Sequence, residues 1–315
     1  MSRIINLNEI KIALESIDVI AAIEHGFISY SRGYSVVPPV GELLFENPPG
    51  DVHIKYGYIK NDAYYVIKIA SGFYENQKLG IPSGQGLMLL FKQETGELLA
   101  VLLDEGHLTD VRTAAAGALC AKHFSPKKIT GVGIIGTGVQ AKLQLKFLQK
   151  HTPCKKVYLW GRDEYKAQKM KEFMGDEYDI TIVSSCSEVA KNSNLIITTT
   201  PSESTLLMAQ DVRKGTLIIA VGSDTHSKQE LESELMTKAD IVIADSLSQS
   251  ESRGEIYRAV LDKAISRDKI VELGTAIQYQ SLGRLNDDKI AVIDLTGVAV
   301  QDIMIASAVY SQLCK

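Results

Sequence analysis

The sequence predicts an α/β protein that combines a doubly wound parallel sheet with a second, α+β domain that uses both chain ends. The chain has 315 residues, about twice the usual domain length of about 150 residues. From residue 129 onward, apolar runs of strand length alternate with amphipathic helical segments, the pattern of a parallel sheet covered by helices. Residues 51–104 instead hold short β-rich runs separated by turn residues, as in an antiparallel sheet.

The first predicted domain comprises residues 1–115 and 296–315. Apolar residues recur every few positions over 8–32, which predicts one amphipathic helix. Four of the eight prolines lie within 37–50 and predict a loop or an edge strand. Strands are predicted at 52–56, 64–69, 86–91 and 98–103, and an alanine-rich helix over 108–123. A last helix over 297–313 is expected to leave the second domain and pack back on the first.

The second predicted domain, residues 116–295, holds the alternating pattern. Its strands are predicted at 130–135, 156–160, 180–184, 195–200, 216–221 and 240–244, with helices in most of the gaps. Ligands bind at the carboxyl ends of the strands in sheets of this kind. The ends of these strands are therefore the places to look for functional residues.

Composition excludes several classes of protein. Hydrophobic residues make up 45% of the chain, charged residues 23%, and the formal net charge is −4, so no basic excess points to nucleic acid or an anionic membrane. No uncharged apolar run approaches the length of a membrane helix, and the N-terminus lacks the apolar core of a signal peptide. The four cysteines lie far apart in the sequence. We expect a cytoplasmic protein with reduced thiols, no bound metal, and neither a nucleic-acid nor a membrane partner.

A glycine-rich turn is the strongest local signal. The strand at 130–135 runs into Gly136-x-Gly138-x-x-Ala141 and then into a helix beginning near Gln140. The first glycine allows the tight turn, the second lets backbone approach a pyrophosphate, and the small third residue lets helix and strand pack closely. The helix N-terminus offers N–H groups to phosphates. The turn predicts dinucleotide binding, and a purely structural turn is the alternative.

The end of the next strand bears on the choice of cofactor. It reads Gly161-Arg162-Asp163; an acid here would bind the ribose diol of NAD, whereas arginine accommodates the 2′-phosphate of NADP. Because the arginine comes first, the sequence favours NADP(H). Alternatively, Arg162 lies over the adenine and Asp163 caps the following helix. The expected cofactor-binding residues are Gly136, Thr137, Gly138, Val139, Gln140, Gly161, Arg162, Asp163 and Thr113.

Cations within the first domain suggest a site for an anionic group. Lys68 lies in the apolar strand Val66–Ile69, where an ammonium is costly unless it is paired or neutral. Lys55 and His53 share one face of the preceding strand by strand alternation. Arg112 offers a planar fork suited to a carboxylate. For each of these cations the alternative is a solvent-facing side chain.

Asp224 follows the strand at 216–221 and is a candidate acid–base group. A helix cap is the alternative, because Ser227-x-x-Glu230 reads as a capping box for a helix beginning there. If Ser227 caps that helix, Asp224 is left free for proton transfer.

Taken together, these residues make the chain resemble the ornithine cyclodeaminase/mu-crystallin family over essentially its full length. The matching features are Lys68 in its strand, Leu108-Thr109-Asp110-x-Arg112-Thr113-Ala114-Ala115, the Gly136–Ala141 turn, Val221-Gly222-Ser223-Asp224, and Thr296-Gly297-Val298-Ala299-Val300-Gln301-Asp302. The resemblance implies a Rossmann-type NAD(P)-binding domain, a substrate and dimerisation domain, and a homodimer. Members interconvert amino acids and imino acids by hydride transfer, or cyclise ornithine to proline with loss of ammonia.

By position, Lys68 and Arg112 resemble the family's ligands for the substrate carboxylate, and Asp224 its catalytic acid, with Lys68 also counted as catalytic. Many members carry an arginine after proline near Pro38, where this chain has Pro39-Val40, so Lys55 is expected to supply the missing charge. Three cations facing only Asp224 would favour an imino dicarboxylate such as iminosuccinate. The alternatives are ornithine cyclodeaminase and a non-catalytic protein that binds NADPH and a small ligand.

Overall fold

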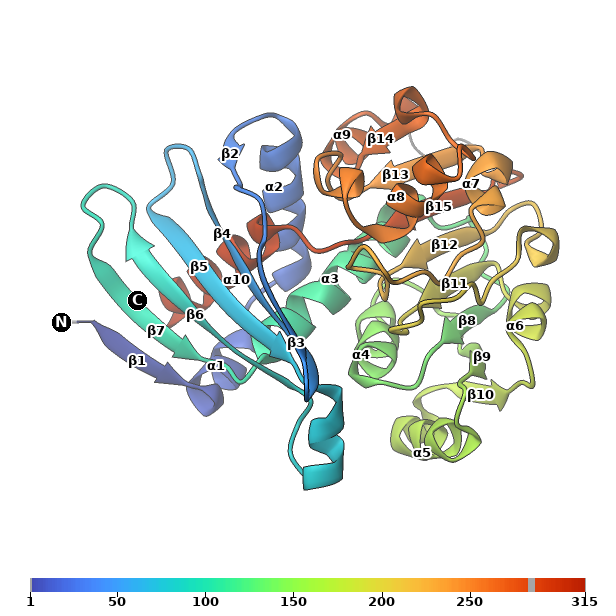
Figure 1. Ribbon diagram of the computed structural model, residues 1–315, viewed down its shortest axis with the longest axis horizontal. Coiled ribbons are helices and arrows are strands. Elements are labelled where there is room, and N and C mark those ends of the chain that lie inside the picture. The colour runs from blue at the N-terminus through green and yellow to red at the C-terminus, as the bar shows by residue number, and fades with distance from the viewer. Residues whose placement is uncertain (1, 283–286, 315) are drawn as a thin grey trace. The chain divides into compact units, whose positions relative to one another are not determined.

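The computed structural model describes residues 2–282 and 287–314. Residues 1 and 315, the outer limits of the first predicted domain, lie outside the described residues, as do 283–286 within the second. The chain forms two compact units (Figure 1). Unit 1 comprises Met1–Thr113 and Val298–Lys315, and unit 2 comprises Ala114–Gly297.

Unit 1 is built on a seven-stranded sheet of order β1-β7-β6-β5-β4-β2, with β3 paired to β4. The β1–β7 pair is parallel and the other pairs are antiparallel, which confirms the predicted antiparallel sheet. Strand β1 is not among the predicted strands, because only one of its four residues is buried and it has no alternating pattern. The strands are β1 (Arg3–Asn6), β2 (Ser35–Val36), β3 (Gly41–Glu46), β4 (Pro49–Ile59), β5 (Tyr64–Gly72), β6 (Gly84–Lys92) and β7 (Leu98–Leu103).

The proline-rich segment contains a loop and an edge strand, as predicted. Residues 37–40 form no regular element, and β3 pairs only with β4 among the strands of the described residues. Pro49 stands at the first position of β4, where a missing N–H is tolerated.

The helices of unit 1 correct one prediction. The single helix expected over 8–32 is wrong: α1 (Leu7–Leu14) and α2 (Val19–Ser31) are separate, because the Asp18 side chain accepts from Ala21 N and starts a new helix. Helix α10 (Ala299–Leu313) packs on α2, β4 and β5, which confirms that the C-terminal helix returns to the first part of the chain. A short 3₁₀ helix covers Tyr74–Leu79.

Unit 2 contains an eight-stranded, wholly parallel sheet of order β10-β9-β8-β11-β12-β15-β13-β14. Its first five strands follow the doubly wound order 3-2-1-4-5, with the reversal between β8 and β11. The strands are β8 (Val132–Ile135), β9 (Lys156–Trp160), β10 (Asp179–Ile182), β11 (Leu195–Thr198), β12 (Leu217–Ala220), β13 (Ile241–Ala244), β14 (Ile270–Glu272) and β15 (Ala291–Asp294).

The helices accompanying this sheet are α4 (Val139–Leu148), α5 (Glu164–Met174), α6 (Cys186–Asn192), α7 (Glu234–Lys238), α8 (Gly254–Leu261) and α9 (Leu273–Gln278). Helix α3 (His107–Phe124) contains the boundary between the units at residue 113.

Two strands of unit 2 are absent from the prediction, and one predicted helix does not form. β14 is only three residues long. β15 is as long as several strands that the sequence does predict, but it enters the sheet between β12 and β13, out of sequence order. Ser227 to Glu230 is not helical, because Glu230 bonds to groups on other segments instead of closing a local cap.

Membrane helices, disulfides and metal clusters are each expected to be absent. Within residues 2–282 and 287–314, no helix has the length and apolar character needed to cross a membrane. All four cysteines are free thiols. The described residues contain no group of three or more histidine, cysteine or acidic side chains that could hold a metal ion.

Candidate functional site

A buried lysine and a buried aspartate form the centre of the candidate site in unit 1. Lys68 in β5 has 2% of its side chain exposed, and its Nζ lies 3.3 Å from Oδ2 of Asp302 in α10. Burial lowers the pKa of Lys68 to about 8, and the Asp302 carboxylate opposes that decrease. The ammonium in the apolar strand is therefore paired, and it loses its proton in the mildly alkaline range.

Arg112 approaches the same aspartate from α3. Its Nε donates to Asp302 Oδ1 at 3.1 Å, and its Nη1 donates to Gln301 Oε1 at 2.9 Å. Gln301 Oε1 also accepts from Val298 N at 3.1 Å. The first turn of α10 thus binds the guanidinium at two of its nitrogens, which accounts for two of its five N–H donors among the bonds of the described residues.

Lys55 belongs to the same cluster. It lies in β4 directly opposite Lys68 in the antiparallel register, and it is 6% exposed. Burial opposes ionisation of Asp302, yet the charges of Lys68, Arg112 and Lys55 hold the pKa of that carboxyl below its usual value. The structure therefore brings the three predicted cations together around one buried carboxylate.

His53 has acidic partners of its own. Its Nε2 lies 2.8 Å from Glu42 Oε1 on β3, and its Nδ1 lies 4.0 Å from Asp51 Oδ1. His53 shares the strand of Lys55, but its interactions are with carboxylates at the edge of the sheet.

Asp302 lies at the centre of the candidate site, but the sequence predicted no role for it beyond its place in the quoted motif. The predicted balance of three cations facing Asp224 alone is wrong, because Asp302 contacts two of those cations directly and neutralises one charge. The available signal was the pair Gln301-Asp302 within a helix that is otherwise largely apolar. Adjacent polar side chains on a buried helix are costly unless they are bonded.

The glycine turn in unit 2 has the geometry of a pyrophosphate-binding loop. Gly136 has a φ of +123°, a conformation that favours glycine, and a Cβ there would clash with Thr199 Oγ1. Gly138 is the N-cap of α4 and supplies no capping side chain. A Cβ on Gly138 would meet no described atom within 4 Å, and Ala141 is fully buried. These features fit a dinucleotide cofactor.

The residues after β9 complete this end of the sheet. A Cβ on Gly161 would clash with Thr137 Cγ2, so the two segments approach closely. Asp163 accepts from Lys166 N at 3.2 Å and caps α5, as in the alternative reading of its role. Arg162 is exposed. Thr113, the last residue of unit 1, donates its hydroxyl to Thr109 O at 2.8 Å.

Asp224 lies in a turn after β12 at the carboxyl edge of the parallel sheet. Its Oδ1 accepts from Lys228 Nζ at 2.7 Å, and its side chain is 38% exposed. The expectation that Asp224 is left free beside a helix capped by Ser227 is therefore wrong, since this segment is not helical and Asp224 is ion-paired. Its exposed carboxylate and adjacent ammonium can still exchange a proton with a bound molecule.

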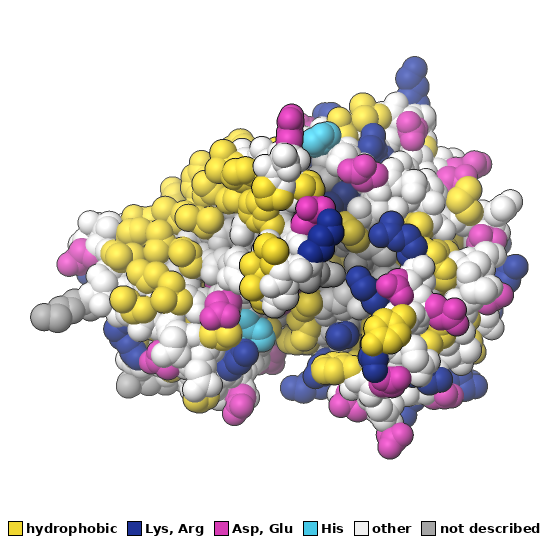
Figure 2. Space-filling view, turned by 60° about the horizontal axis from the view of Figure 1, so that its bottom comes forward, with side chains coloured by type: hydrophobic (Ala, Val, Ile, Leu, Met, Phe, Trp, Pro, Cys, Tyr) yellow, Lys and Arg dark blue, Asp and Glu magenta, His cyan; other side chains and the backbone are white. Residues whose placement is uncertain are grey.

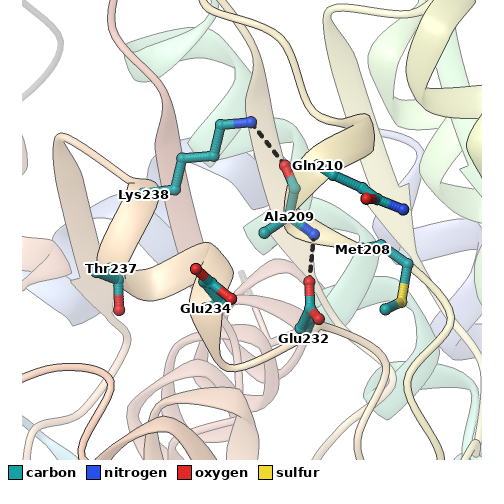
Figure 3. A pocket seen from close by; sticks show the side chains of 7 residues that line it. All are labelled: Met208, Ala209, Gln210, Glu232, Glu234, Thr237 and Lys238. Atoms are coloured by element: carbon teal, nitrogen blue, oxygen red, sulfur yellow. Dashed lines mark hydrogen bonds between the residues drawn. The ribbon is translucent and has the colours of Figure 1, made fainter.

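A cavity of about 500 Å³ lies elsewhere in unit 2 (Figure 3). Two of its polar side chains bond to backbone: Lys238 Nζ donates to Ala209 O at 2.6 Å, and Glu232 Oε2 accepts from Ala209 N at 2.6 Å. None of the predicted site residues is among the residues that line it.

The chain is similar to known proteins over almost its whole length. The model of the ornithine cyclodeaminase/mu-crystallin family matches residues 2–315. Uncharacterized cyclodeaminase y4tK of Sinorhizobium fredii is 37% identical over 300 residues, covering 94% of this chain and 91% of that protein. Alanine dehydrogenase of Archaeoglobus fulgidus is 33% identical over 308 residues, with 98% and 94% covered. Iminosuccinate reductase of Paracoccus denitrificans is 30% identical over 288 residues, with 91% and 89% covered.

Solved structures share the whole fold. An archaeal alanine dehydrogenase dimer with bound NAD superposes with a TM-score of 0.90 at 30% identity, covering 99% of this chain and 96% of that one. The Δ1-pyrroline-2-carboxylate reductase of Thermococcus litoralis, in complex with NADH and L-proline, gives 0.91 at 26% identity, with 99% and 97% covered.

Proposed function

Because the chain belongs to the ornithine cyclodeaminase/mu-crystallin family, we propose that it is an NAD(P)-dependent oxidoreductase that interconverts a small α-imino acid and its L-amino acid. The observation that carries the proposal is the buried convergence of Lys55, Lys68 and Arg112 in a chain that also holds a pyrophosphate-type loop. A cluster of buried cations can bind an anion. The carboxylate of an imino acid supplies it.

The cation cluster would bind the substrate carboxylate. Lys68 offers a point charge. In the bonds of the described residues, Arg112 donates through Nε to Asp302 and through Nη1 to Gln301, and its other N–H groups can bind a substrate carboxylate. A guanidinium presents its N–H groups as a planar fork that matches a carboxylate. Asp302 holds both cations in place before the substrate arrives, which reduces the cost of ordering them.

The residues expected to hold the cofactor are Gly136 to Gln140, Gly161, Arg162, Asp163 and Thr113. When bound, the nicotinamide supplies or accepts the hydride at the α-carbon. Reduction of an imine adds that hydride to carbon and a proton to nitrogen. Asp224 would transfer the proton, and Lys228, 2.7 Å away, would stabilise its carboxylate form.

An imino dicarboxylate such as iminosuccinate is the substrate class that we favour. Lys68, Arg112 and Lys55 all lower the pKa of the Asp302 carboxyl, so a second substrate carboxylate would meet a further cation beside those that bind the first. Ornithine would add an ammonium, and like charges a few ångströms apart repel. The similarity to an iminosuccinate reductase supports the same choice.

Steady-state kinetics with both reduced cofactors test the proposal. A reductase oxidises NADH or NADPH with an imino acid, or with a 2-oxo acid plus ammonia; oxaloacetate with ammonia should be the best pair. Release of ammonia from ornithine with no net change of cofactor would instead identify a cyclodeaminase. Binding of cofactor without turnover of any of these substrates would identify a binding protein.

Replacing Lys55 tests the dicarboxylate assignment. Lys55→Ala should raise the KM for the imino dicarboxylate at least tenfold and change the KM for neutral imino acids much less, because it removes the charge that pairs with the second carboxylate. Lys92→Ala is a matched control, since Lys92 lies in the same sheet but forms an exposed pair with Glu94. Equal KM increases for both substrate classes, or faster turnover of ornithine than of any dicarboxylate, would contradict the assignment.

We further propose a cytoplasmic homodimer with a preference for NADP(H). Unit 1 exposes large apolar side chains, among them Ile4, Leu43, Leu44 and Leu103, and hydrophobic side chains gather over one of its faces (Figure 2). Large exposed apolar patches are typical of subunit interfaces, and a similar alanine dehydrogenase is a dimer. Light scattering on a size-exclusion column should give twice the chain mass, and a monomer at micromolar concentration would contradict the proposal.

A further inference from the structure

A network of buried carboxylates, Glu230, Glu255 and Asp294, lies at the carboxyl edge of the sheet in unit 2 and has no part in the proposed function. Glu230 has no exposed surface, Glu255 is 2% exposed, and Asp294 has none. Burial raises the pKa of Glu230 to about 7 and that of Glu255 to about 8. Burying a carboxyl group costs free energy unless hydrogen bonds compensate for the lost water.

Glu230 connects the ends of two neighbouring strands. Its Oε1 accepts from Thr200 N at 2.6 Å and from Thr200 Oγ1 at 2.7 Å, beyond the end of β11. Its Oε2 accepts from Thr198 Oγ1 at 2.7 Å and from Gly222 N at 3.0 Å, beyond the end of β12. Each carboxylate oxygen therefore accepts one backbone N–H and one threonine hydroxyl.

The bond to Gly222 fixes the turn that carries Asp224. A Cβ on Gly222 would clash with the Thr200 backbone, so the turn packs directly on the end of β11. Ser223 is buried and donates to Lys228 O at 2.9 Å, while Lys228 Nζ bonds the Asp224 carboxylate. A short series of bonds thus links the Glu230 carboxylate to the position of the Asp224 side chain.

The backbone of Glu230 is fixed by a second carboxylate. Glu255 in α8 accepts from Glu230 N at 2.7 Å through Oε1 and from Leu231 N at 3.1 Å through Oε2. Asp294 at the end of β15 accepts from Ile256 N at 2.9 Å and anchors the start of α8. The turn is therefore supported by successive layers of carboxylate-to-backbone bonds.

From this geometry we infer that Glu230 is a positioning residue for Asp224. By bonding to the ends of β11 and β12 at the same time, Glu230 fixes the turn that carries Asp224. The inference rests on the proposed role of Asp224 in proton transfer. Glutamine cannot replace Glu230, because its NH₂ group must face either Gly222 N–H or Thr200 N–H, and two donors cannot bond. The substitution therefore loosens the turn with almost no change in side-chain volume.

Kinetics of Glu230→Gln test the inference. A displacement of about 1 Å can lower a rate by about a hundredfold, so kcat should fall about ten- to a hundredfold, with KM and the cofactor Kd each changed less than about threefold. Asp224→Asn combined with Glu230→Gln should be no slower than Asp224→Asn alone, since Glu230 acts through Asp224. Glu232→Gln is the matched control: Glu232 bonds the Ala209 backbone at the cavity of Figure 3 and should retain the parent kcat.

Amide hydrogen exchange provides a readout independent of turnover. In Glu230→Gln the amides of residues 221–228 should exchange at least tenfold faster, and Glu232→Gln should leave them unchanged. If Glu230→Gln does not fold, Thr198→Val removes one bond to the same Oε2 and should produce smaller changes in the same direction.

Three results would overturn the inference. They are unchanged amide exchange in residues 221–228 of Glu230→Gln, a kcat of Glu230→Gln equal to that of Glu232→Gln, and a kcat of the double variant that is lowered by the product of the two single losses. If Asp224→Asn alone keeps full activity, the proposed role of Asp224 is wrong. Faster amide exchange in Glu230→Gln would still show that Glu230 orders the turn at residues 221–228.

Discussion

Substitution of Asp302 by asparagine tests the central contact of the candidate site. Asp302 is 1% exposed, and its two oxygens lie 3.3 Å from Lys68 Nζ and 3.1 Å from Arg112 Nε. Asparagine has nearly the same shape, so the change removes charge and little else. The buried cations Lys55, Lys68 and Arg112 then share the site without the Asp302 carboxylate.

The size of the effect follows from the distance. Two unit charges 3.3 Å apart attract by ~5 kcal/mol at an effective dielectric constant of about 20, and each pKa unit corresponds to about 1.4 kcal/mol. The pKa of Lys68, about 8 in the parent protein, should therefore fall well below the assay range near neutrality. Neutral Lys68 no longer attracts a substrate carboxylate. Breaking a buried ion pair also costs about 3–5 kcal/mol of folding stability.

The assay is the pH dependence of kcat/KM for the imino acid. In the parent, Lys68 is protonated below pH 8 and neutral above it, so kcat/KM should fall as pH rises through about 8. In Asp302→Asn the fall should begin at lower pH, with a loss of at least about thirtyfold at pH 8 and partial recovery on acidification. Urea unfolding monitored by circular dichroism shows what fraction of the variant is folded at each pH.

Glu172→Gln is the matched control for charge. Glu172 pairs with Lys169 at 2.9 Å, and both side chains are about half exposed, so its loss should change stability little and leave the pH profile unchanged. If the profile of folded Asp302→Asn coincides with that of the parent, Asp302 does not control the charge of Lys68, and the reasoning is refuted.

Three further substitutions address the cofactor and the proton. Gly138→Trp should abolish NAD(P)H binding, because the indole fills the space beside the loop that lies open at Gly138; an unchanged fluorescence titration of a folded variant would contradict it. Arg162→Ala should weaken NADPH binding far more than NADH binding, and equal increases in the two Kd values would argue against a contact with the 2′-phosphate. Asp224→Asn should keep cofactor and substrate binding but lower kcat about 10²- to 10⁴-fold, and a loss below about fivefold would assign Asp224 to structure.

The predictable parts of this protein are those encoded by neighbouring residues. The sequence Gly136-x-Gly138 after an apolar run predicts a strand, a turn and a helix, because each glycine meets a local steric requirement. Strand alternation likewise places Lys55 on a definite face of β4. Its position opposite Lys68 depends on the register between two strands joined by a short connection, which local patterns constrain strongly.

The unpredicted parts depend on residues far apart in sequence. Arg112 and Asp302 are separated by 190 positions, and no local pattern identifies that pair. Ser227-x-x-Glu230 has the letters of a capping box, yet Glu230 forms bonds with Thr198, Thr200 and Gly222 that outweigh a single helix cap. Tertiary bonds of this kind override local propensity, as does the insertion of β15 between β12 and β13.

The return of α10 to unit 1 has a consequence for synthesis on the ribosome. Unit 2 is continuous and is complete at Gly297, whereas unit 1 lacks Asp302 and the rest of α10 until residues 298–314 have been translated. Domains tend to fold as units during synthesis, so unit 2 can fold first. The strands that carry Lys55 and Lys68, although made early, must wait for the last helix before their ammonium groups gain a buried counter-ion.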